Sequence, residues 1–259
     1  MNLDTQAISK KIKRPAQITP SLKADLEFAI INGEQTLPSK AKFYPTKILY
    51  VRGLRYKEQL EIAQINNNLE DKLLAWNSVI RVYQRCIELE GLTFENLLAE
   101  DFITLALWIV FLTNPEQIYQ LQYLCKNCGK SADIDISPSQ MELQDFTLFE
   151  TQNVETELGT LQIAPITMQE FIAEQNITMD KLTEALLLGQ HIKKVNGSVL
   201  DSLQDKLEVY GSLSPKEVKK VREIALKFKS GIIPIECVCN HCKHKAQITP
   251  TLDLLRGLP

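Results

Sequence analysis

Apolar residues recur at spacings near 3.6 over two stretches of the N-terminal half, a pattern that predicts α-helices with a buried face. The first stretch starts near Tyr56, and the second starts after Thr93, contains the apolar run 105–112 and ends at Asn114. This run is shorter than the ~20 residues that cross a bilayer, so we expect a helix buried on most sides. These helices are predicted to form a first hydrophobic core. The apolar positions of the first stretch are Leu60, Ala63, Ile65, Leu73, Leu74, Trp76, Ile80, Val82, Tyr83 and Ile87.

Less regular segments precede these helices. Residues 22–31 are predicted to form a short amphipathic helix that stops at Asn32-Gly33. Two prolines keep residues 37–45 extended, whereas residues 47–54 have the composition of a strand. We expect both segments to lie against the helical core.

Past residue 115 the pattern mixes strands and helices. Residues 146–149 and 159–163 are predicted to be strands, and Asn196-Gly197 predicts a hairpin turn. Capping boxes open helices at Thr167 and Ser214, because a hydroxyl and a carboxylate three residues later can satisfy free backbone amides there. The other helices predicted in this part of the chain span residues 180–188 and 201–210.

Two Cys-x-x-Cys turns stand far apart, one at Cys125 and Cys128 and the other at Cys239 and Cys242. An alanine and an isoleucine follow each pair at the same offsets, so the order strand, knuckle, strand occurs twice, as in a zinc ribbon. Four thiolates are the ligand set of a closed zinc site. The sequence therefore predicts one structural Zn²⁺ held by all four cysteines, with a folded insertion between the two turns.

The long separation of the two pairs does not rule out a single site. Closing a loop of roughly 110 residues costs about 4 kcal/mol of chain entropy, whereas a structural zinc ion contributes about 10–16 kcal/mol in small peptides. Two alternatives stay open, namely half-sites completed by different subunits and a redox dithiol. The redox alternative is less favoured, because both pairs lead into strand-like sequence rather than into a helix.

Three further residues near the second pair could replace a ligand, namely Cys237, His241 and His244. We leave them out of the predicted site, because the turn from Cys239 to Cys242 matches the first knuckle. A zinc ion with four thiolates has no open position for water, which favours a structural site over a catalytic one.

No catalytic residue and no organic cofactor are predicted. Gly129-Lys130-Ser131 lacks the first glycine of a phosphate-binding loop, and neither His-Glu-x-x-His nor Gly-x-Ser-x-Gly occurs. We therefore expect that the protein is not an enzyme. Among the remaining candidates, Cys86 is expected to be a buried apolar residue, Asp133 and Asp135 to be solvated, and His191 to lie at the surface or in a turn.

Composition adds limits on the class of protein. The chain has 259 residues, is 44% hydrophobic and 24% charged, and carries a net charge of −3, which is ordinary for a globular protein and gives no global attraction for nucleic acid. Four of the six cysteines lie in metal-like pairs, which favours a reducing compartment. The N-terminus lacks the apolar core of a signal peptide, so secretion by that route is not expected. The basic arm before Pro20 is either a solvated tail or a segment that orders on an acidic partner.

Several motifs occur in an order that resembles a known family. They are Leu37-Pro38-Ser39-Lys40 with Tyr44, Val51-Arg52-Gly53-Leu54, the segment from Leu97 to Phe102, Cys125-x-x-Cys128, Val195-Asn196-Gly197, Ser214-Pro215 and Cys239-x-x-Cys242. In this order the chain, over residues 36–250, resembles the T4-like baseplate hub or hub-assembly proteins of phages with contractile tails and of related contractile injection systems. The family often has glycine at the position of Ala41, and proline and glycine where this chain has Asn240 and Lys243. These departures concern tight backbone turns more than metal ligands.

The resemblance implies a non-enzymatic part of a tail baseplate in the virion, assembled in the host cytoplasm. It implies other baseplate proteins as partners, in the form of hub, tube or wedge subunits, and several copies of the chain itself. No small-molecule substrate and no membrane are expected, and nucleic acid is an unfavoured partner. The alternative function is a zinc-ribbon nucleic-acid or transcription accessory protein, which Lys126, Lys130, Lys243 and Lys245 near the knuckles would serve.

The predicted fold class is α+β, with a helical N-terminal core and a split four-cysteine zinc ribbon that carries a mixed α/β insertion. The predicted division of the chain is an arm with a short helix (1–35), an extended segment with a strand and the helical core (36–115), the split ribbon (116–137 and 231–250), the insertion (138–230) and a C-terminal segment (251–259).

Overall fold

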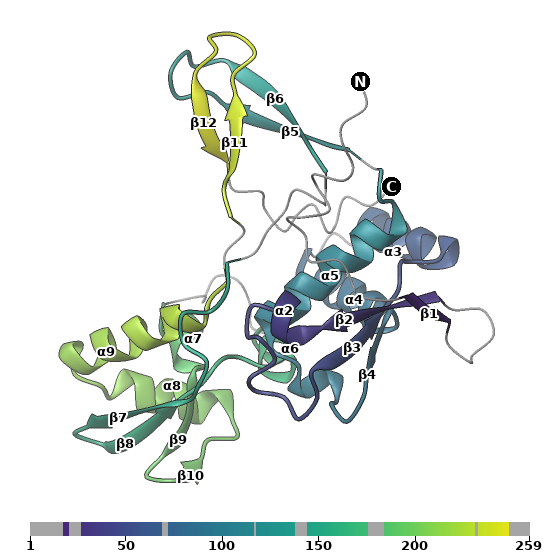
Figure 1. Ribbon diagram of the computed structural model, residues 1–259. Helices are drawn as coiled ribbons and strands as arrows, with labels where there is room; N and C mark the ends of the chain where they lie inside the picture. Colours follow the sequence, from purple (N-terminus) through teal and green to yellow (C-terminus); the bar gives the residue numbers. More distant parts are fainter. Residues whose placement is uncertain are drawn as a thin grey trace.

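The computed structural model describes residues 18–20, 27–68, 72–116, 118–137, 144–175, 184–230 and 233–248. These residues form both helices and antiparallel sheets, which confirms the α+β class. Figure 1 shows three groups of elements: an N-terminal part built around α5, a second part that contains β7–β10 with α7–α9, and a pair of hairpins that project from the other two. The three groups differ in what holds them together.

The N-terminal part contains an antiparallel sheet of four strands in the order β1-β2-β3-β4. The strands are β1 (Ile18–Pro20), β2 (Glu27–Asn32), β3 (Ile48–Val51) and β4 (Ile87–Leu89). The helix predicted for residues 22–31 is wrong over residues 27–31, which belong to β2, and residues 22–26 lie outside the described chain. Ile31 is fully buried in this strand and lies opposite Leu49 of β3. Pairing with β3 therefore decides the conformation over the local helical pattern.

Five helical segments complete the N-terminal part: α2 (Gly33–Thr36), α3 (Tyr56–Asn68), α4 (Lys72–Gln84), the 3₁₀ turn η1 (Phe94–Asn96) and α5 (Ala99–Thr113). Ten of the 15 residues of α5 are buried, as its apolar run predicts. Phe102 at its start meets Tyr83 and Phe94 edge to face, and Cys86 is fully buried beside this core, as predicted. In the part of the chain that the structure describes, no helix combines the length and the apolar composition needed to cross a membrane.

The second part contains an antiparallel sheet in the order β10-β9-β8-β7, with helices both between β8 and β9 and after β10 in the chain. Its elements are β7 (Gln152–Thr156), β8 (Gly159–Ile163), α6 (Met168–Gln175), α7 (Glu184–Gly189), β9 (Ile192–Val195), β10 (Ser198–Val199), α8 (Leu203–Gly211), α9 (Pro215–Ala225) and the 3₁₀ turn η4 (Leu226–Phe228). Helix α6 is an exception within this stretch, because its Met168 is buried in the core of the N-terminal part.

Local sequence signals in this part are mostly confirmed. Both capping boxes form, with Glu170 accepting from the Thr167 amide at 2.9 Å and Glu217 accepting from the Ser214 amide at 2.8 Å. Asn196 and Gly197 have φ values of 50° and 82°, as the tight turn between β9 and β10 requires. The strand predicted at residues 146–149 does not form, because Phe146 instead buries its ring against Phe228 in the second core.

The prediction that residues 37–45 are extended is wrong, because these residues form successive turns in which the amides of Lys40 and Lys42 donate to the carbonyls of Leu37 and Ser39. A buried carboxylate at the start of α5 fastens this loop. Asp101 accepts hydrogen bonds from the amide and the hydroxyl of Ser39, at 3.0 and 2.5 Å, and from the hydroxyl of Tyr44, at 2.5 Å. Tyr44 in turn accepts from the amide of Leu98 at 2.8 Å. Burial raises the pKa of Asp101 to about 6, although these hydrogen bonds act in the opposite direction.

The same loop connects the N-terminal and second parts. Leu37 and Ala41 are buried in the first core, whereas Phe43 packs edge to face on Phe228 of the second. The carbonyl of Pro38 accepts from the amide of Phe146 at 3.0 Å. The Pro-Ser motif seen in the sequence is therefore a structural junction between two cores.

Candidate metal centre

The third group of elements consists of two β-hairpins that carry the cysteine pairs at their turns. Strands β5 (Tyr119–Leu124) and β6 (Ser131–Ile136) form the first, and β11 (Ile235–Val238) and β12 (Lys245–Ile248) form the second. Figure 1 shows them side by side, with their turns pointing away from the rest of the molecule. At the other end of the hairpins, Ile136 is buried in the first core and Ile235 packs against it. The turns are thus presented on a short stalk with a fixed base.

The two turns have the same backbone hydrogen bonds. In the first, the amide of Cys125 donates to the carbonyl of Lys130 at 3.0 Å, and the amide of Gly129 donates to the carbonyl of Cys125 at 2.8 Å. In the second, Cys239 donates to His244 and Lys243 donates to Cys239, both at 2.9 Å. Both turns are therefore knuckles of one geometry, as their repeated sequence pattern predicts.

This geometry requires a left-handed residue directly after the second cysteine. Gly129 has φ 68° in the first knuckle, and Lys243 has φ 61° in the second. Glycine adopts this conformation without a steric penalty, whereas a residue with a Cβ atom is strained there. Lysine at position 243, where the family that the sequence resembles often has glycine, therefore leaves the turn intact at some cost in backbone energy. Ala41, the other departure, also has a positive φ, of 52°.

The four cysteines of the two knuckles meet in one cluster. Their Sγ atoms all lie within 4.8 Å of one another. The Sγ atoms of Cys125 and Cys242 are 3.7 Å apart, and those of Cys128 and Cys239 are 3.9 Å apart. A zinc ion with Zn–S bonds of about 2.3 Å in a tetrahedron needs S···S distances of about 3.8 Å. The cluster thus has the size and the donor atoms that such an ion requires.

Polar groups around the cluster favour the ionised thiol at one ligand in particular. The side-chain amide of Asn127 donates to Sγ of Cys242 at 3.5 Å, and this contact with backbone amides lowers the pKa of Cys242 to about 6. At Cys128 a backbone hydrogen bond lowers the pKa, but desolvation and the three neighbouring thiols outweigh it and raise the value to about 11. Four adjacent thiolates repel one another, so a divalent cation would favour full deprotonation of the cluster.

Other contacts hold the two hairpins together around the cysteines. Cys125 and Cys239 are almost fully buried, and Ala132 of β6 is buried in the same cluster. A ring nitrogen of His241 lies 2.9 Å from the carbonyl of Ser131 on the other hairpin. The contacts of Asn127 with Cys242 and of His241 with Ser131 were not predicted from the sequence. The only sequence signal for them was the position of each residue between two paired cysteines.

The other residues considered from the sequence lie outside the cluster. Sγ of Cys237 lies 3.4 Å from the carbonyl of Ala246, and His244 is exposed and contributes its carbonyl to the knuckle. Asp133 and Asp135 are exposed on β6, as expected for solvated charges. His191 does lie in a turn, but the expectation that it could be a surface residue is wrong. Its ring is buried and stacks on Phe228, and burial lowers its pKa to about 3.

Comparisons with known proteins give one result. A family model described as "T4 bacteriophage base plate protein" matches residues 34–255, a range that includes both knuckles and the whole stretch between them. Neither a curated protein nor a solved structure matches the chain.

Proposed function

The chain belongs to the T4 bacteriophage base plate protein family, and from this membership we propose that it is a non-enzymatic component of a contractile tail baseplate or of a related injection system. The family supports a structural role in the phage tail, and it implies a location in the virion tail and contacts with other baseplate proteins. The observation that carries the proposal is the match over residues 34–255. It covers every element from β3 to β12, and α2 except for its first residue.

The second element of the proposal is a structural zinc ion bound by Cys125, Cys128, Cys239 and Cys242 in a split ribbon. The S···S distances of 3.7 and 3.9 Å support it. Each hairpin has only two strands, and an isolated two-stranded hairpin is marginally stable in water. A bound ion would supply the missing stability, and four thiolates leave no coordination position for a reacting water.

The third element of the proposal concerns how the parts are used. The residue ranges 1–35, 36–115, 116–137 with 231–250, 138–230 and 251–259 would be the structural units, and the N-terminal arm, the ribbon and residues 252–255 would contact hub, tube or wedge proteins. Several copies of the chain would act in one baseplate, assembled in the host cytoplasm. The contact of Phe43 with Phe228 and the hydrogen bond from the amide of Phe146 to the carbonyl of Pro38 join the ranges 36–115 and 138–230, which suits a structural component.

The metal part is tested by analysing the zinc content of the purified chain. About one zinc ion per chain is expected, and Cys125→Ser and Cys239→Ser should both lose it. Cys237→Ser is the matched control and should retain the ion, because its Sγ contacts a carbonyl rather than the cluster. Zinc retained in either ligand variant would mean that the assigned ligands are wrong.

The assembly part is tested in cells that produce the phage. A tagged full-length chain should sediment with tail particles or baseplate precursors, and it should co-purify with identified tail proteins. A well-folded, zinc-loaded chain that associates with no tail component would contradict the proposed function.

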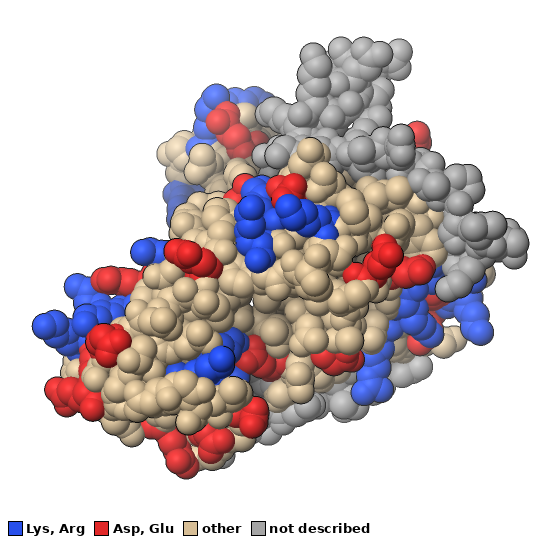
Figure 2. Space-filling model, turned by 60° about the horizontal axis from the view of Figure 1, so that its bottom comes forward, with Lys and Arg blue, Asp and Glu red and all other residues tan. Residues whose placement is uncertain are grey.

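A second candidate function, nucleic-acid binding through the ribbon, is favoured by one observation. Lys126, Lys130, Lys243 and Lys245 are all exposed beside the knuckles. However, a zinc ion with four thiolates carries a charge of about −2, which these lysines would offset. Away from the ribbon, Figure 2 brings the bottom of the molecule in Figure 1 forward and shows positive and negative side chains interspersed there. A nucleic-acid binder should lose affinity steeply with salt, so salt-sensitive gel shifts that disappear on exchange of these lysines would favour this candidate.

A further inference from the structure

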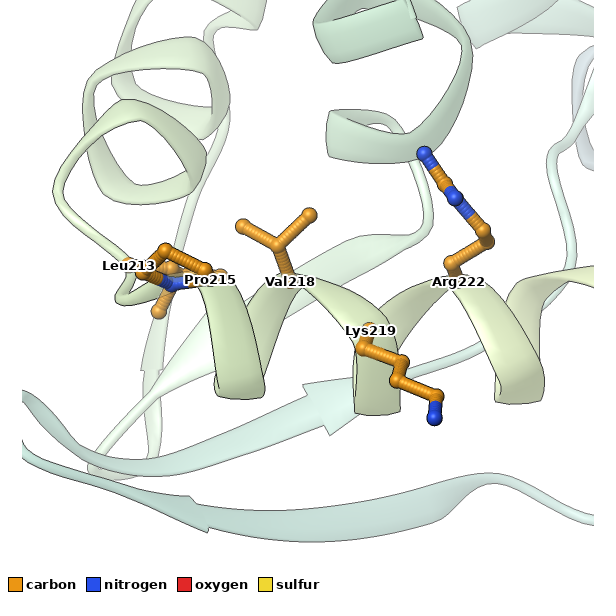
Figure 3. A pocket seen from close by; sticks show the side chains of 5 residues that line it. All are labelled: Leu213, Pro215, Val218, Lys219 and Arg222. Carbon is orange, nitrogen blue, oxygen red and sulfur yellow. The ribbon is translucent and has the colours of Figure 1, made fainter.

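A shallow open hollow lies along α9 in the second part of the fold (Figure 3). It has a volume of about 420 Å³ and is lined by Leu213, Pro215, Val218, Lys219 and Arg222. Val218 points into the space between Leu213 and Pro215 at one end and Arg222 at the other, and Lys219 flanks it. The hollow therefore joins an aliphatic floor to cationic side chains.

The same side of α9 continues beyond the hollow. Val218 and Arg222 are four residues apart and so are neighbours on the surface of the helix, and Leu226 follows directly in the 3₁₀ turn η4. Leu226 is 53% exposed, whereas Val218 is partly buried against the second core and Val221 and Ala225 are fully buried in it. An aliphatic side chain is thus left in solvent at the end of this helix.

Charge is concentrated on this segment. Residues 215–229 contain six Lys or Arg and two Asp or Glu, a net charge of +4, whereas the rest of the chain has 23 Lys or Arg and 30 Asp or Glu, a net charge of −7. One of the two acids, Glu217, is turned inward, where it accepts from Ser214 and from the amide of Glu157. The other, Glu223, lies 4.0 Å from Lys219 in an exposed pair, which neutralises little of the field.

We propose that the surface of α9 around this hollow is a docking surface for an acidic segment of another baseplate protein, which seats an aliphatic side chain in the hollow and carboxylates against the exposed Lys216 and Lys219. The inference rests on the proposed function and names the chemistry of one partner. Exposed lysines favour association with an acidic segment through charge complementarity. The apolar lining distinguishes a protein from a nucleic acid, because single strands are held on aromatic rings and the hollow is lined by Leu, Pro and Val.

The experiment uses a photo-reactive amino acid placed at Lys219 in the full-length chain, expressed in cells that produce the phage. Mass spectrometry then identifies the cross-linked peptide. Lys57, an exposed lysine near the start of α3, is the matched control position. The expected result is a cross-link from position 219, and not from position 57, to a baseplate-protein segment with net negative charge and an aliphatic residue close to the cross-linked site.

Charge reversal gives an independent readout of the same surface. Lys216→Glu with Lys219→Glu should lower the yield of the identified complex about tenfold or more, because both on-rate and specificity depend on charge complementarity. Lys57→Glu with Arg81→Glu changes the net charge equally and should leave the complex intact. Zinc content and far-UV circular dichroism confirm that each variant is folded.

The possible outcomes distinguish failure of the docking surface from failure of the proposed function. The docking surface alone is refuted if the chain enters baseplates and the Lys216/Lys219 and Lys57/Arg81 double substitutions have the same effect. It is also refuted if position 219 cross-links to nucleic acid or to a basic segment. A chain that enters no baseplate refutes both.

Discussion

Exchanging the residues that follow the two cysteine pairs should shift zinc affinity in opposite directions. A non-glycine residue in the left-handed region costs about 1–2 kcal/mol, and Lys243 holds φ 61° there. Glycine avoids this strain but loses about 0.5–1 kcal/mol more conformational entropy on folding. Lys243→Gly should therefore stabilise the second knuckle by about 0.5–1 kcal/mol.

The opposite change is Gly129→Lys in the first knuckle. A Cβ atom at Gly129 would meet no atom within 4 Å, so the added cost comes from the backbone alone. Because each knuckle must be formed to bind the ion, these energies convert to about a two- to fivefold gain in zinc affinity for Lys243→Gly and a similar loss for Gly129→Lys. Competition against a chromophoric chelator at fixed pH measures both.

The matched control is Gly197→Lys in the turn between β9 and β10. Gly197 also has a positive φ, of 82°, and space for a Cβ atom, but it lies in a different sheet from the cysteines. This variant should be less stable in urea and should bind zinc as the wild type does. The reasoning would be refuted if Lys243→Gly, Gly129→Lys and Gly197→Lys all bound zinc with the same affinity. It would also be refuted if Lys243→Gly and Gly129→Lys changed the zinc affinity in the same direction.

Further predictions concern the buried polar groups and one close backbone contact. Asp101→Ala should lower the free energy of unfolding in urea by about 3 kcal/mol or more, because it leaves the buried donors of Ser39 and Tyr44 unpaired. Gly53→Ala should be destabilising in the same assay, since its Cβ would lie 2.9 Å from backbone atoms of Leu112 and Thr113, and a near-wild-type midpoint would contradict the close approach. The pKa of Asp101 is raised from 3.8 to about 6, so the folded state binds this proton more tightly than the unfolded state does. The contribution of Asp101 to the free energy of unfolding therefore falls as the pH rises from about 4 to 6. Asp101→Asn should remove this slope from the pH dependence of the free energy of unfolding. Burial raises the pKa of Glu170, but Lys193 and Lys206 outweigh this effect and lower the pKa to about 2. The ionised carboxylate therefore contributes about 3 kcal/mol to the free energy of unfolding above pH 4.5, and this contribution is lost as the pH falls toward 2. Glu170→Gln should abolish that loss.

Features governed by neighbouring residues could be predicted from the sequence. The knuckles, the capping boxes at Thr167 and Ser214 and the turn at Asn196-Gly197 each depend on the side chains and backbone angles of a few consecutive residues. The apolar run in α5 was equally clear, because a helix buried on most sides leaves little room for polar residues. The proximity of the four cysteines followed from the chemistry of zinc rather than from any local pattern.

Features governed by distant partners could not be predicted. The segment at Ile31 is a strand because β3 pairs with it, and Phe146 leaves strand geometry because the second core takes up its ring. His191 is buried only because Phe228 and Ala164, from other parts of the chain, surround it. The role of Asp101 depended on the loop 37–45 folding back over α5.

The split of the cysteine pairs has a consequence for biosynthesis. Cys128 and Cys239 are 111 residues apart, and ribosomes add about 5–20 residues per second, so the first pair of thiols waits roughly 6–20 s before the second pair has been translated. During that interval the early hairpin has only half of the proposed ligand set, and the nascent segment that separates the pairs must become compact enough to return the late hairpin to it. The stalk is therefore the last region to mature, and a reducing, metal-buffered environment matters most while the polypeptide is still being made.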